Sequence, residues 1–323
     1  MKRRNPDQNR SKKNIVLTRK TGHNDGFGAQ LQRILGVYCI CKEYNLKYFH
    51  TPMVDIGYQG VTALQANKNS QQFVDECNNR FNPDSDISFE DIVHYKKIDE
   101  NLNKSQLDNV PENTLVQYAY PYCITDKYPE IYRHAKDIFK TRKKKNSVFT
   151  IGMHVRRGEL FVVNSDRMLP NSFYIGIARR IVRICKNYNI ECIVELYTDM
   201  PVKSILVTPD HPGISNRIEK NVKISPSNYQ IYEFDQILNL KKYINEELLD
   251  TFDRMINSDI LIMSRSSLSA CASYLKKGIS IYHPFWHSMM KRDIAYNDSR
   301  FESRLIEYIT ALNNFPTNKN SGT

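Results

Sequence analysis

Short apolar segments alternate with longer amphipathic ones through the second half of the chain, and this alternation limits the fold more than any other feature. Four apolar runs have the length of strands, at residues 147–153, 190–197, 259–263 and 279–282. Between them, apolar residues recur with helical spacing at residues 172–186, 246–257 and 264–277. Strands that alternate with helices form parallel sheets through right-handed crossovers. The sequence therefore predicts an α/β fold.

The first half begins with a similar strand–loop–helix unit. A β-branched run at 14–18 is followed by a glycine-containing loop at 22–28 and by a helical pattern from 29 to 45. Residues 65–112 are polar and rich in Asn, Asp and Gln, which indicates loops and short helices, and Pro129–Phe139 is a helix candidate. A chain of 323 residues has the length of two ordinary α/β domains, and we place them at 1–145 and 146–323.

The composition excludes a disordered chain, because 41% of the residues are hydrophobic and 25% are charged. A formal net charge of +11 favours an anionic ligand, but it fits a nucleic-acid partner equally well. The densest basic run, Lys140–Lys145, lacks the interleaved aromatic residues that stack on bases. We therefore interpret that run as a solvated linker.

No stretch approaches the roughly 18 to 20 apolar residues of a membrane helix, so we expect no membrane span in this chain. The seven cysteines are an odd number, and several lie inside apolar periodic segments, which favours free thiols in a reducing compartment. The expected location is the cytoplasm, or the Golgi lumen if a longer protein carries a membrane anchor ahead of this sequence.

Three polar clusters directly follow predicted strands, at residues 154–159, 198–199 and 264–269. In open parallel sheets, ligands bind at the carboxyl ends of the strands. We therefore expect the three clusters to meet at one edge of the second sheet and to form a binding site there.

The first cluster reads His154-Val155-Arg156-Arg157-Gly158-Glu159. Side chains alternate direction along a strand, so one arginine can enter the site while its neighbour braces the loop. A guanidinium holds a diphosphate through paired, charge-assisted hydrogen bonds, and we assign this role first to Arg156. A salt bridge to nearby acidic residues at the strand end is the alternative.

The serine-rich segment 264–269 combines hydroxyl groups with the free N–H groups of a predicted helix start. Such a start is a second anion site, for which Ser266, Ser267 and Ser269 are the candidates. Serines also cap helices for structural reasons alone. Its position at the same sheet edge as Arg156 favours the anion site.

The His154–Glu159 segment resembles the H-x-R-R motif of the alpha-1,2- and alpha-1,6-fucosyltransferases and the protein O-fucosyltransferases. Residues 251–270 are similar to a later motif of the alpha-1,2 group, in which a helix with a central Met leads to a strand, a serine loop and a further helix. Gly26-Phe27-Gly28-Ala29-Gln30-Leu31 resembles the opening G-x-G-N-Q segment of that group. The three motifs occur in the family's order.

This resemblance implies a GT-B fold, with two facing Rossmann-like domains. It assigns 1–145 to the acceptor side and 146–323 to the nucleotide-sugar donor, and it implies GDP-fucose as donor, a glycan acceptor, inversion at the sugar carbon, and no metal or other cofactor. We expect no nucleic-acid partner. Donor contacts are expected from His154, Arg156, Arg157, Tyr197, Asp199, Ser266, Ser267, Ser269, Gly26, Gly28 and His23.

An inverting transfer requires a group that takes the proton of the acceptor hydroxyl. In the alpha-1,6 relatives this base lies about ten residues beyond the motif's His, so the resemblance points to Asp166, with Glu159 and Asp25 as rivals. A structural role in capping the loop is an equal alternative for Asp166.

Two other interpretations stay open. Ala29, Glu159 and Ala270-Cys271 differ from the family pattern, which leaves room for another GDP-, UDP- or dTDP-linked sugar as donor. A basic nucleic-acid-binding protein is a rival from a different class. Asp84-Ser85-Asp86 has the D-x-D form of metal-dependent transferases, but it does not follow an apolar strand, so we expect no metal site there.

Overall fold

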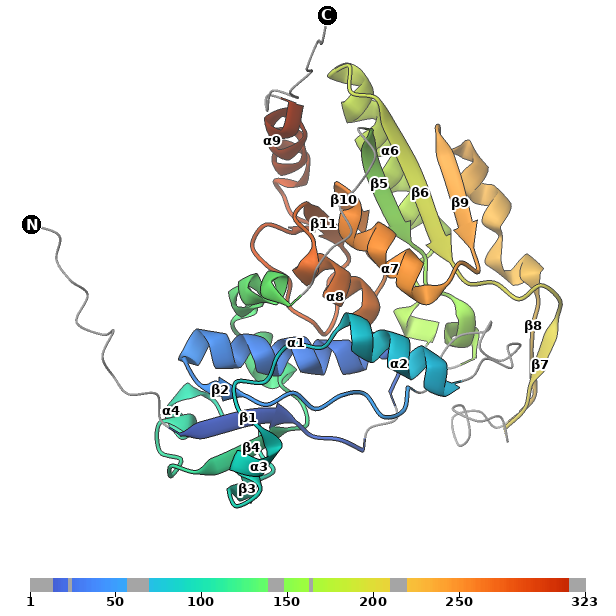
Figure 1. The fold of residues 1–323 in the computed structure, drawn as a ribbon. Helices are drawn as coiled ribbons and strands as arrows, with labels where there is room; N and C mark the ends of the chain where they lie inside the picture. Colours follow the sequence, from blue (N-terminus) through green and yellow to red (C-terminus); the bar gives the residue numbers. More distant parts are fainter. Residues whose placement is uncertain are drawn as a thin grey trace, which may run out of the picture.

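The structure is a computed structural model, and it describes residues 14–22, 25–56, 70–138, 148–162, 165–209 and 220–313. Two parallel sheets form the framework, one of four strands from the first half of the chain and one of six strands from the second half (Figure 1). The predicted α/β class with two parallel sheets is confirmed. The basic run Lys140–Lys145 lies outside the described residues.

The amino-terminal sheet has the order β2-β1-β4-β3, and each neighbouring pair is parallel. Its strands are β2 (Lys47–Tyr48), β1 (Ile15–Arg19), β4 (Thr114–Tyr118) and β3 (Lys96–Ile98). Helix α1 (Phe27–Tyr44) follows β1 as predicted and ends at Asn45, which adopts the left-handed conformation. Ile15 and Leu17 of β1 belong to the same apolar cluster as α1, so this helix covers one face of the sheet.

The middle of the first half is built from short elements, as its polar sequence predicts. They are α2 (Ser70–Arg80), α3 (Phe89–Ile92), α4 (Lys104–Leu107), α5 (Tyr122–Thr125) and η2 (Pro129–Asp137). The helix predicted at Pro129–Phe139 is a 3-10 helix over Pro129–Asp137. Strands β3 and β4 are not predicted from the sequence, since each has at most five residues and a polar sequence beside it.

The carboxyl-terminal sheet has the order β12-β11-β10-β5-β6-β9, and all its strand pairs are parallel. The strands are β12 (Ile294–Ala295), β11 (Ile279–Tyr282), β10 (Ile260–Ile262), β5 (Phe149–His154), β6 (Cys192–Thr198) and β9 (Leu240–Ile244). The four predicted strands are present as β5, β6, β10 and β11.

Helices cover both faces of this sheet. On one face, α6 (Asn171–Asn187) and α9 (Phe301–Asn313) share an apolar cluster with β5 and β6. On the other face lie α7 (Leu248–Asn257) and α8 (Ser267–Leu275). An antiparallel pair, β7 (Ile205–Val207) and β8 (Val222–Ile224), forms a separate small sheet that lies beyond the carboxyl ends of β6 and β9 (Figure 1). Short 3-10 helices are η3 (Gly158–Phe161), η4 (Ser165–Arg167), η5 (Pro226–Tyr229) and η6 (Ile231–Gln236).

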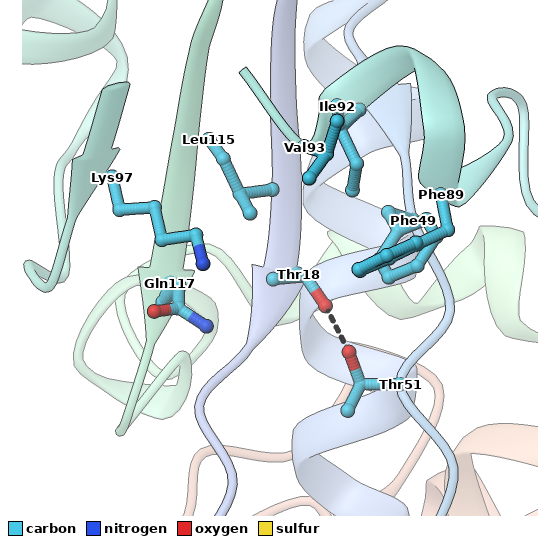
Figure 2. A pocket seen from close by; sticks show the side chains of 9 residues that line it. All are labelled: Thr18, Phe49, Thr51, Phe89, Ile92, Val93, Lys97, Leu115 and Gln117. Atoms are coloured by element: carbon cyan, nitrogen blue, oxygen red, sulfur yellow. Dashed lines mark hydrogen bonds between the residues drawn. The ribbon is translucent and has the colours of Figure 1, made fainter. Parts of the chain in front are cut away.

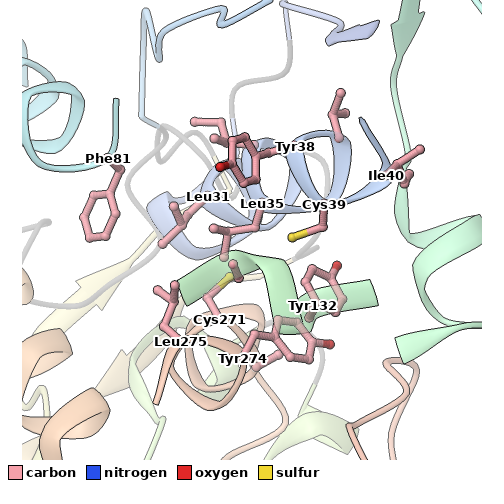
Figure 3. Packing of buried hydrophobic residues seen from close by; sticks show 14 of the residues in the cluster. Leu31, Leu35, Tyr38, Cys39, Ile40, Phe81, Tyr132, Cys271, Tyr274 and Leu275 are labelled. Carbon is pink, nitrogen blue, oxygen red and sulfur yellow. The ribbon is translucent and has the colours of Figure 1, made fainter. Parts of the chain in front are cut away.

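A continuous apolar core joins the two halves. One cluster of buried side chains includes α1 residues from the first half together with α7 and α8 residues from the second. Figure 3 shows Leu35 and Cys39 of α1 facing Cys271 and Tyr274 of α8. The rings of Tyr132 and Tyr274 stack at 3.7 Å. The two halves are therefore lobes that share an apolar interface.

Among the described residues, no helix combines the length and the hydropathy that crossing a membrane requires.

Candidate functional site

The basic motif begins at the carboxyl end of a central strand. Strand β5 lies between β10 and β6, and His154 is its last residue. The serine-rich segment connects β10 to α8, and Asp199 directly follows β6. Because β10, β5 and β6 are parallel neighbours, the three predicted clusters meet at one edge of the sheet.

Hydrogen bonds fasten the motif to the serine-rich segment. The Ser264 hydroxyl donates to the backbone carbonyl of His154 at 2.6 Å and accepts from the backbone N–H of Arg156 at 2.8 Å. The Nδ1 atom of His154 lies 2.6 Å from the hydroxyl of Ser269. Burial, and then the charge of Arg156, lower the pKa of His154 to about 3, so its ring is neutral near pH 7.

The two arginines have different surroundings, as their alternation predicts. Arg157 is buried, its guanidinium donates to the side chain of Asn171 and to the carbonyl of Arg156, and it lies over the ring of Tyr174. Arg156 is partly exposed at the strand end. Arg157 therefore braces the loop, while Arg156 is the arginine of the pair that reaches the surface.

A glycine turns the chain out of the motif. Gly158 has a φ of 52°, in the left-handed region that disfavours other residues, and its N–H donates to the Tyr229 hydroxyl at 3.2 Å. The next residue, Glu159, lies in η3, and its side chain is outside the described part of the structure.

The three candidate serines differ in what their hydroxyl groups contact. Ser266 is buried and caps α8 by accepting from the N–H of Leu268 at 3.1 Å. Ser269 is buried against His154 and also accepts from the N–H of Ser264 at 3.3 Å. Ser267 is partly exposed, and its hydroxyl lies 3.2 Å from Nε2 of His287. Of the three, Ser267 is the one that is partly exposed, and it is the first residue of α8.

The amino terminus of α1 lies directly against the amino terminus of α8. A Cβ atom placed on Gly28 would lie 2.5 Å from the backbone nitrogen of Leu268. Cys271 donates through its thiol to the carbonyl of Gly28, and Gly26 is the residue that precedes α1. Both helix starts carry partial positive charge, so their meeting favours an anion nearby. His23 lies outside the described residues.

Strand β6 ends in residues with unequal exposure. The Tyr197 ring is fully buried, and its hydroxyl donates to Glu195 at 2.6 Å. The Thr198 hydroxyl donates to the carbonyl of Val155 at 2.7 Å and so ties β6 to the motif. Asp199 is partly exposed. The structure therefore places Asp199 at the surface of the site, and Tyr197 in the core beneath it.

The carboxylates proposed as bases occupy different places. Asp166 is exposed in η4, and its backbone carbonyl accepts from Arg265, the residue that precedes the capping serine of α8. Asp25 lies before α1 and forms a salt bridge with the buried Arg33. The structure thus brings Asp166 next to the serine segment, whereas the carboxylate of Asp25 is already held by a cation.

Two residues of the D-x-D sequence, Asp86 and Ser85, make hydrogen bonds to the backbone at the end of β2. Asp86 accepts from the N–H of Tyr48 at 2.9 Å, and the hydroxyl of Ser85 accepts from the N–H of His50 at 2.9 Å. The segment thereby holds the end of β2. Across the described ranges, no group of three or more His, Cys, Asp or Glu side chains has a metal-binding arrangement.

A cavity of about 130 Å³ lies away from this edge, on the face of the amino-terminal sheet opposite α1. Figure 2 shows the Thr18–Thr51 hydrogen bond below it, with Phe49 and Phe89 on one side and Lys97 on the other. None of the residues assigned above lines this cavity. We therefore place the candidate site at the strand ends, where the motifs and the helix starts meet.

Sequence reasoning does not find several residues that organise the site. Asn171 and Tyr229 bond to the arginine loop from α6 and η5, and Tyr174 of α6 lies under Arg157 and bonds to Ser264. His287 contacts Ser267 from the aromatic segment that follows β11. The run Tyr282-His283-Pro284-Phe285-Trp286-His287 is an available signal, since it is rich in aromatic residues and follows a strand.

No protein-family model matches the chain, and no curated protein is significantly similar to it in sequence. Several solved structures do resemble it. The alpha-1,6-fucosyltransferase NodZ soaked with GDP-fucose is 12% identical to this chain. The match covers 82% of this chain and 93% of the NodZ chain, with a TM-score of 0.35. POFUT1 in complex with GDP is 11% identical to this chain. The match covers 84% of this chain and 98% of the POFUT1 chain, with a TM-score of 0.36.

A third structure, the E. coli heptosyltransferase WaaC with ADP, is 9% identical, covers 84% of this chain and 88% of its own, and has a TM-score of 0.38. NodZ, in the first of these structures, is an alpha-1,6-fucosyltransferase, a group that the sequence motifs resemble. Identities and TM-scores of this size describe a remote likeness. We therefore take the chemistry of the site from the residues of this chain.

Proposed function

We propose that this chain is a glycosyltransferase that transfers a sugar from a nucleoside-diphosphate donor, GDP-fucose, to a hydroxyl group of a glycan. One observation carries the proposal: the loop of Arg156 is hydrogen-bonded through Ser264 to the serine segment, where the amino termini of α1 and α8 meet. A guanidinium and two helix starts at one place form a cradle for a diphosphate.

The proposed transfer breaks the bond between the sugar carbon and the diphosphate oxygen, and forms a bond from that carbon to the acceptor oxygen. Negative charge grows on the leaving GDP, and Arg156 and the backbone N–H groups at the start of α8 stabilise it through hydrogen bonds. The acceptor hydroxyl loses its proton to a carboxylate as the new bond forms. Attack from the side opposite the leaving group inverts the sugar carbon.

Asp166 is our first candidate for this carboxylate, because it is exposed and its turn is tied to Arg265 beside the serine segment. Glu159 and Asp25 are the rivals. Variants Asp166→Asn, Glu159→Gln and Asp25→Asn distinguish them, since loss of the base lowers kcat by about 100-fold or more and leaves GDP binding within a few-fold.

Calorimetry with GDP tests the clamp. We expect Arg156→Ala to weaken binding at least about 100-fold, because a charge-assisted, bidentate contact is lost. Arg179→Ala is the matched control, since Arg179 is an exposed arginine on α6 that bonds to Gln236. Equal binding by the Arg156 variant and the control would refute the clamp.

Turnover of a panel of nucleotide sugars identifies the donor. We expect GDP-fucose to be consumed, and activity to persist in EDTA, because the proposed transfer uses no metal. If a UDP- or dTDP-linked sugar were consumed and GDP-fucose were not, the chain would still be a glycosyltransferase, but the donor proposed here would be wrong. Binding that depends steeply on salt and is spread over many Lys and Arg residues would instead indicate a nucleic-acid partner.

A further inference from the structure

His287 forms a polar link between the two lobes. Its ring is buried, and Nε2 lies 3.2 Å from the hydroxyl of Ser267, the first residue of α8. Its Nδ1 lies 3.1 Å from the side-chain amide of Gln32, a buried residue of α1, and 3.6 Å from a carboxylate oxygen of Asp126. One side of the ring therefore faces the carboxyl-terminal lobe, and the other faces the amino-terminal lobe.

The neighbouring indole fixes the tautomer of this ring. Trp286 donates through Nε1–H to Nε2 of His287 at 2.9 Å, and an indole N–H can only donate. Nε2 is therefore the acceptor and Nδ1 carries the proton. That proton points to Gln32, whose amide must present its oxygen, and the nearby Asp126 carboxylate favours the same tautomer.

A neutral imidazole has one acceptor and one donor, and here each serves a different lobe. The acceptor side holds the Ser267 hydroxyl, and the donor side is held by α1. Aromatic neighbours fix the plane of the ring, since Tyr122 and Phe285 lie at centroid distances of 5.8 Å and 5.5 Å from His287. A shift of α1 would therefore move the partner of the Ser267 hydroxyl.

We propose that His287 is a positioning residue through which Gln32 in the amino-terminal lobe sets the position of Ser267, and with it the first backbone N–H groups of α8, in the donor-phosphate site. This inference rests on the proposed function, because it gives the start of α8 a phosphate to bind. Gln32 and Ser267 lie on different lobes, and the described contacts join them through His287. Energetic coupling between them would therefore pass through the imidazole.

A double-mutant cycle on GDP binding tests this coupling. We expect Gln32→Met and Ser267→Ala each to weaken GDP binding about three- to tenfold, which is the range for the loss of one hydrogen bond. The double variant should bind GDP no more weakly than whichever single variant has the lower GDP affinity. The coupling should disappear in a His287→Asn background, whose shorter side chain does not reach the position of Nε2.

Ser273 provides the control, because it lies on the same helix but bonds to Asp293 instead of His287. Effects of Gln32→Met and Ser273→Ala on GDP binding should simply add. Additive effects for Gln32 and Ser267 as well would overturn the inference while leaving the transferase intact.

Nitrogen-15 NMR of the histidine rings gives a readout that does not depend on activity. We expect His287 to appear as the neutral tautomer protonated at Nδ1, with the assignment made by loss of its signals in His287→Asn. A ring protonated at Nε2 would overturn the link. Failure of the wild-type chain to bind GDP would sink the proposed function, and the tautomer would then still decide whether the link exists.

Discussion

The Nδ1 atom of His154 lies 2.6 Å from the hydroxyl of Ser269, so the end of β5 is fastened to the first turn of α8. Both groups are buried, and the ring is neutral because its pKa is lowered to about 3. The first residue of the basic motif thus supports the serine segment from below. The positive charge of the motif comes from the arginines that follow it.

The buried His154 makes stability depend on pH. Its pKa is lower in the folded chain than the ordinary 6.5, so the unfolded chain binds more protons between pH 3 and 6.5. Its contribution to stability is therefore present above pH 6.5 and is lost as the pH falls, by up to about 1.4 kcal/mol per pH unit. Urea unfolding from pH 4 to 7 should show a shallower pH dependence for His154→Gln than for the wild type.

Other groups with shifted pKa values contribute to this profile, among them His50 and Asp293. His50 has a pKa lowered to about 4 by burial and then by Arg19, so it acts in the same direction as His154. Burial raises the pKa of Asp293 to about 6, so its contribution is present below pH 3.8 and is lost as the pH rises through 6. The comparison with His154→Gln isolates one histidine, and identical slopes would contradict its buried, neutral state.

Arg157 should matter for stability more than for ligand contact. Its guanidinium holds Asn171 and the carbonyl of Arg156, so Arg157→Ala should lower the free energy of unfolding by about 1–3 kcal/mol. Arg157→Lys should not restore it, since an ammonium group lacks the planar fork that makes both contacts. Denaturant unfolding measures the loss, and full recovery with Lys would argue against the bracing role.

Gly28→Ala should force the two lobes apart. The added methyl would lie 2.5 Å from the backbone nitrogen of Leu268, so we expect a loss of about 1–3 kcal/mol in unfolding free energy. Gly176→Ala is the matched control, because no atom beyond its chain neighbours and the backbone of its own helix lies within 4 Å of its Cβ position on α6. That control should gain about 0.5–1 kcal/mol. A neutral Gly28 variant would contradict the close contact of the helix starts.

Tyr197→Phe separates a core role from a ligand contact. The hydroxyl of Tyr197 donates to the buried Glu195, so its removal should cost about 1–3 kcal/mol of stability. Because the ring is fully buried, GDP affinity measured by calorimetry should change less than about twofold. If GDP affinity fell strongly while the free energy of unfolding stayed unchanged, Tyr197 would instead contact the nucleotide, as expected from the sequence.

The carboxyl-terminal sheet is predictable from sequence because its central strands are continuous apolar runs. Strands β5 and β10 are buried on both faces, and the residues that follow them are polar. By contrast, β9 contains adjacent lysines and β12 has two residues, so neither gives a strand pattern. Their pairing is decided by neighbours distant in the sequence.

The site is predictable in its position and less so in its individual contacts. Three polar clusters follow the strands β5, β6 and β10. Because these strands are parallel neighbours, the clusters lie at the same edge of the sheet, as the sequence predicts. The contact of Ser267 with His287, and that of His287 with Gln32, depend on how the lobes pack. No local spacing encodes such contacts.

Gly28 and Leu268 touch backbone to backbone between the two sheets. If one lobe rotates relative to the other, the smallest displacements occur next to this contact, which would act as a pivot. The proposed diphosphate site lies beside the pivot, whereas the outer ends of the lobes would swing furthest. Such a rotation would therefore change access for the proposed acceptor while leaving the geometry of the proposed diphosphate site nearly constant.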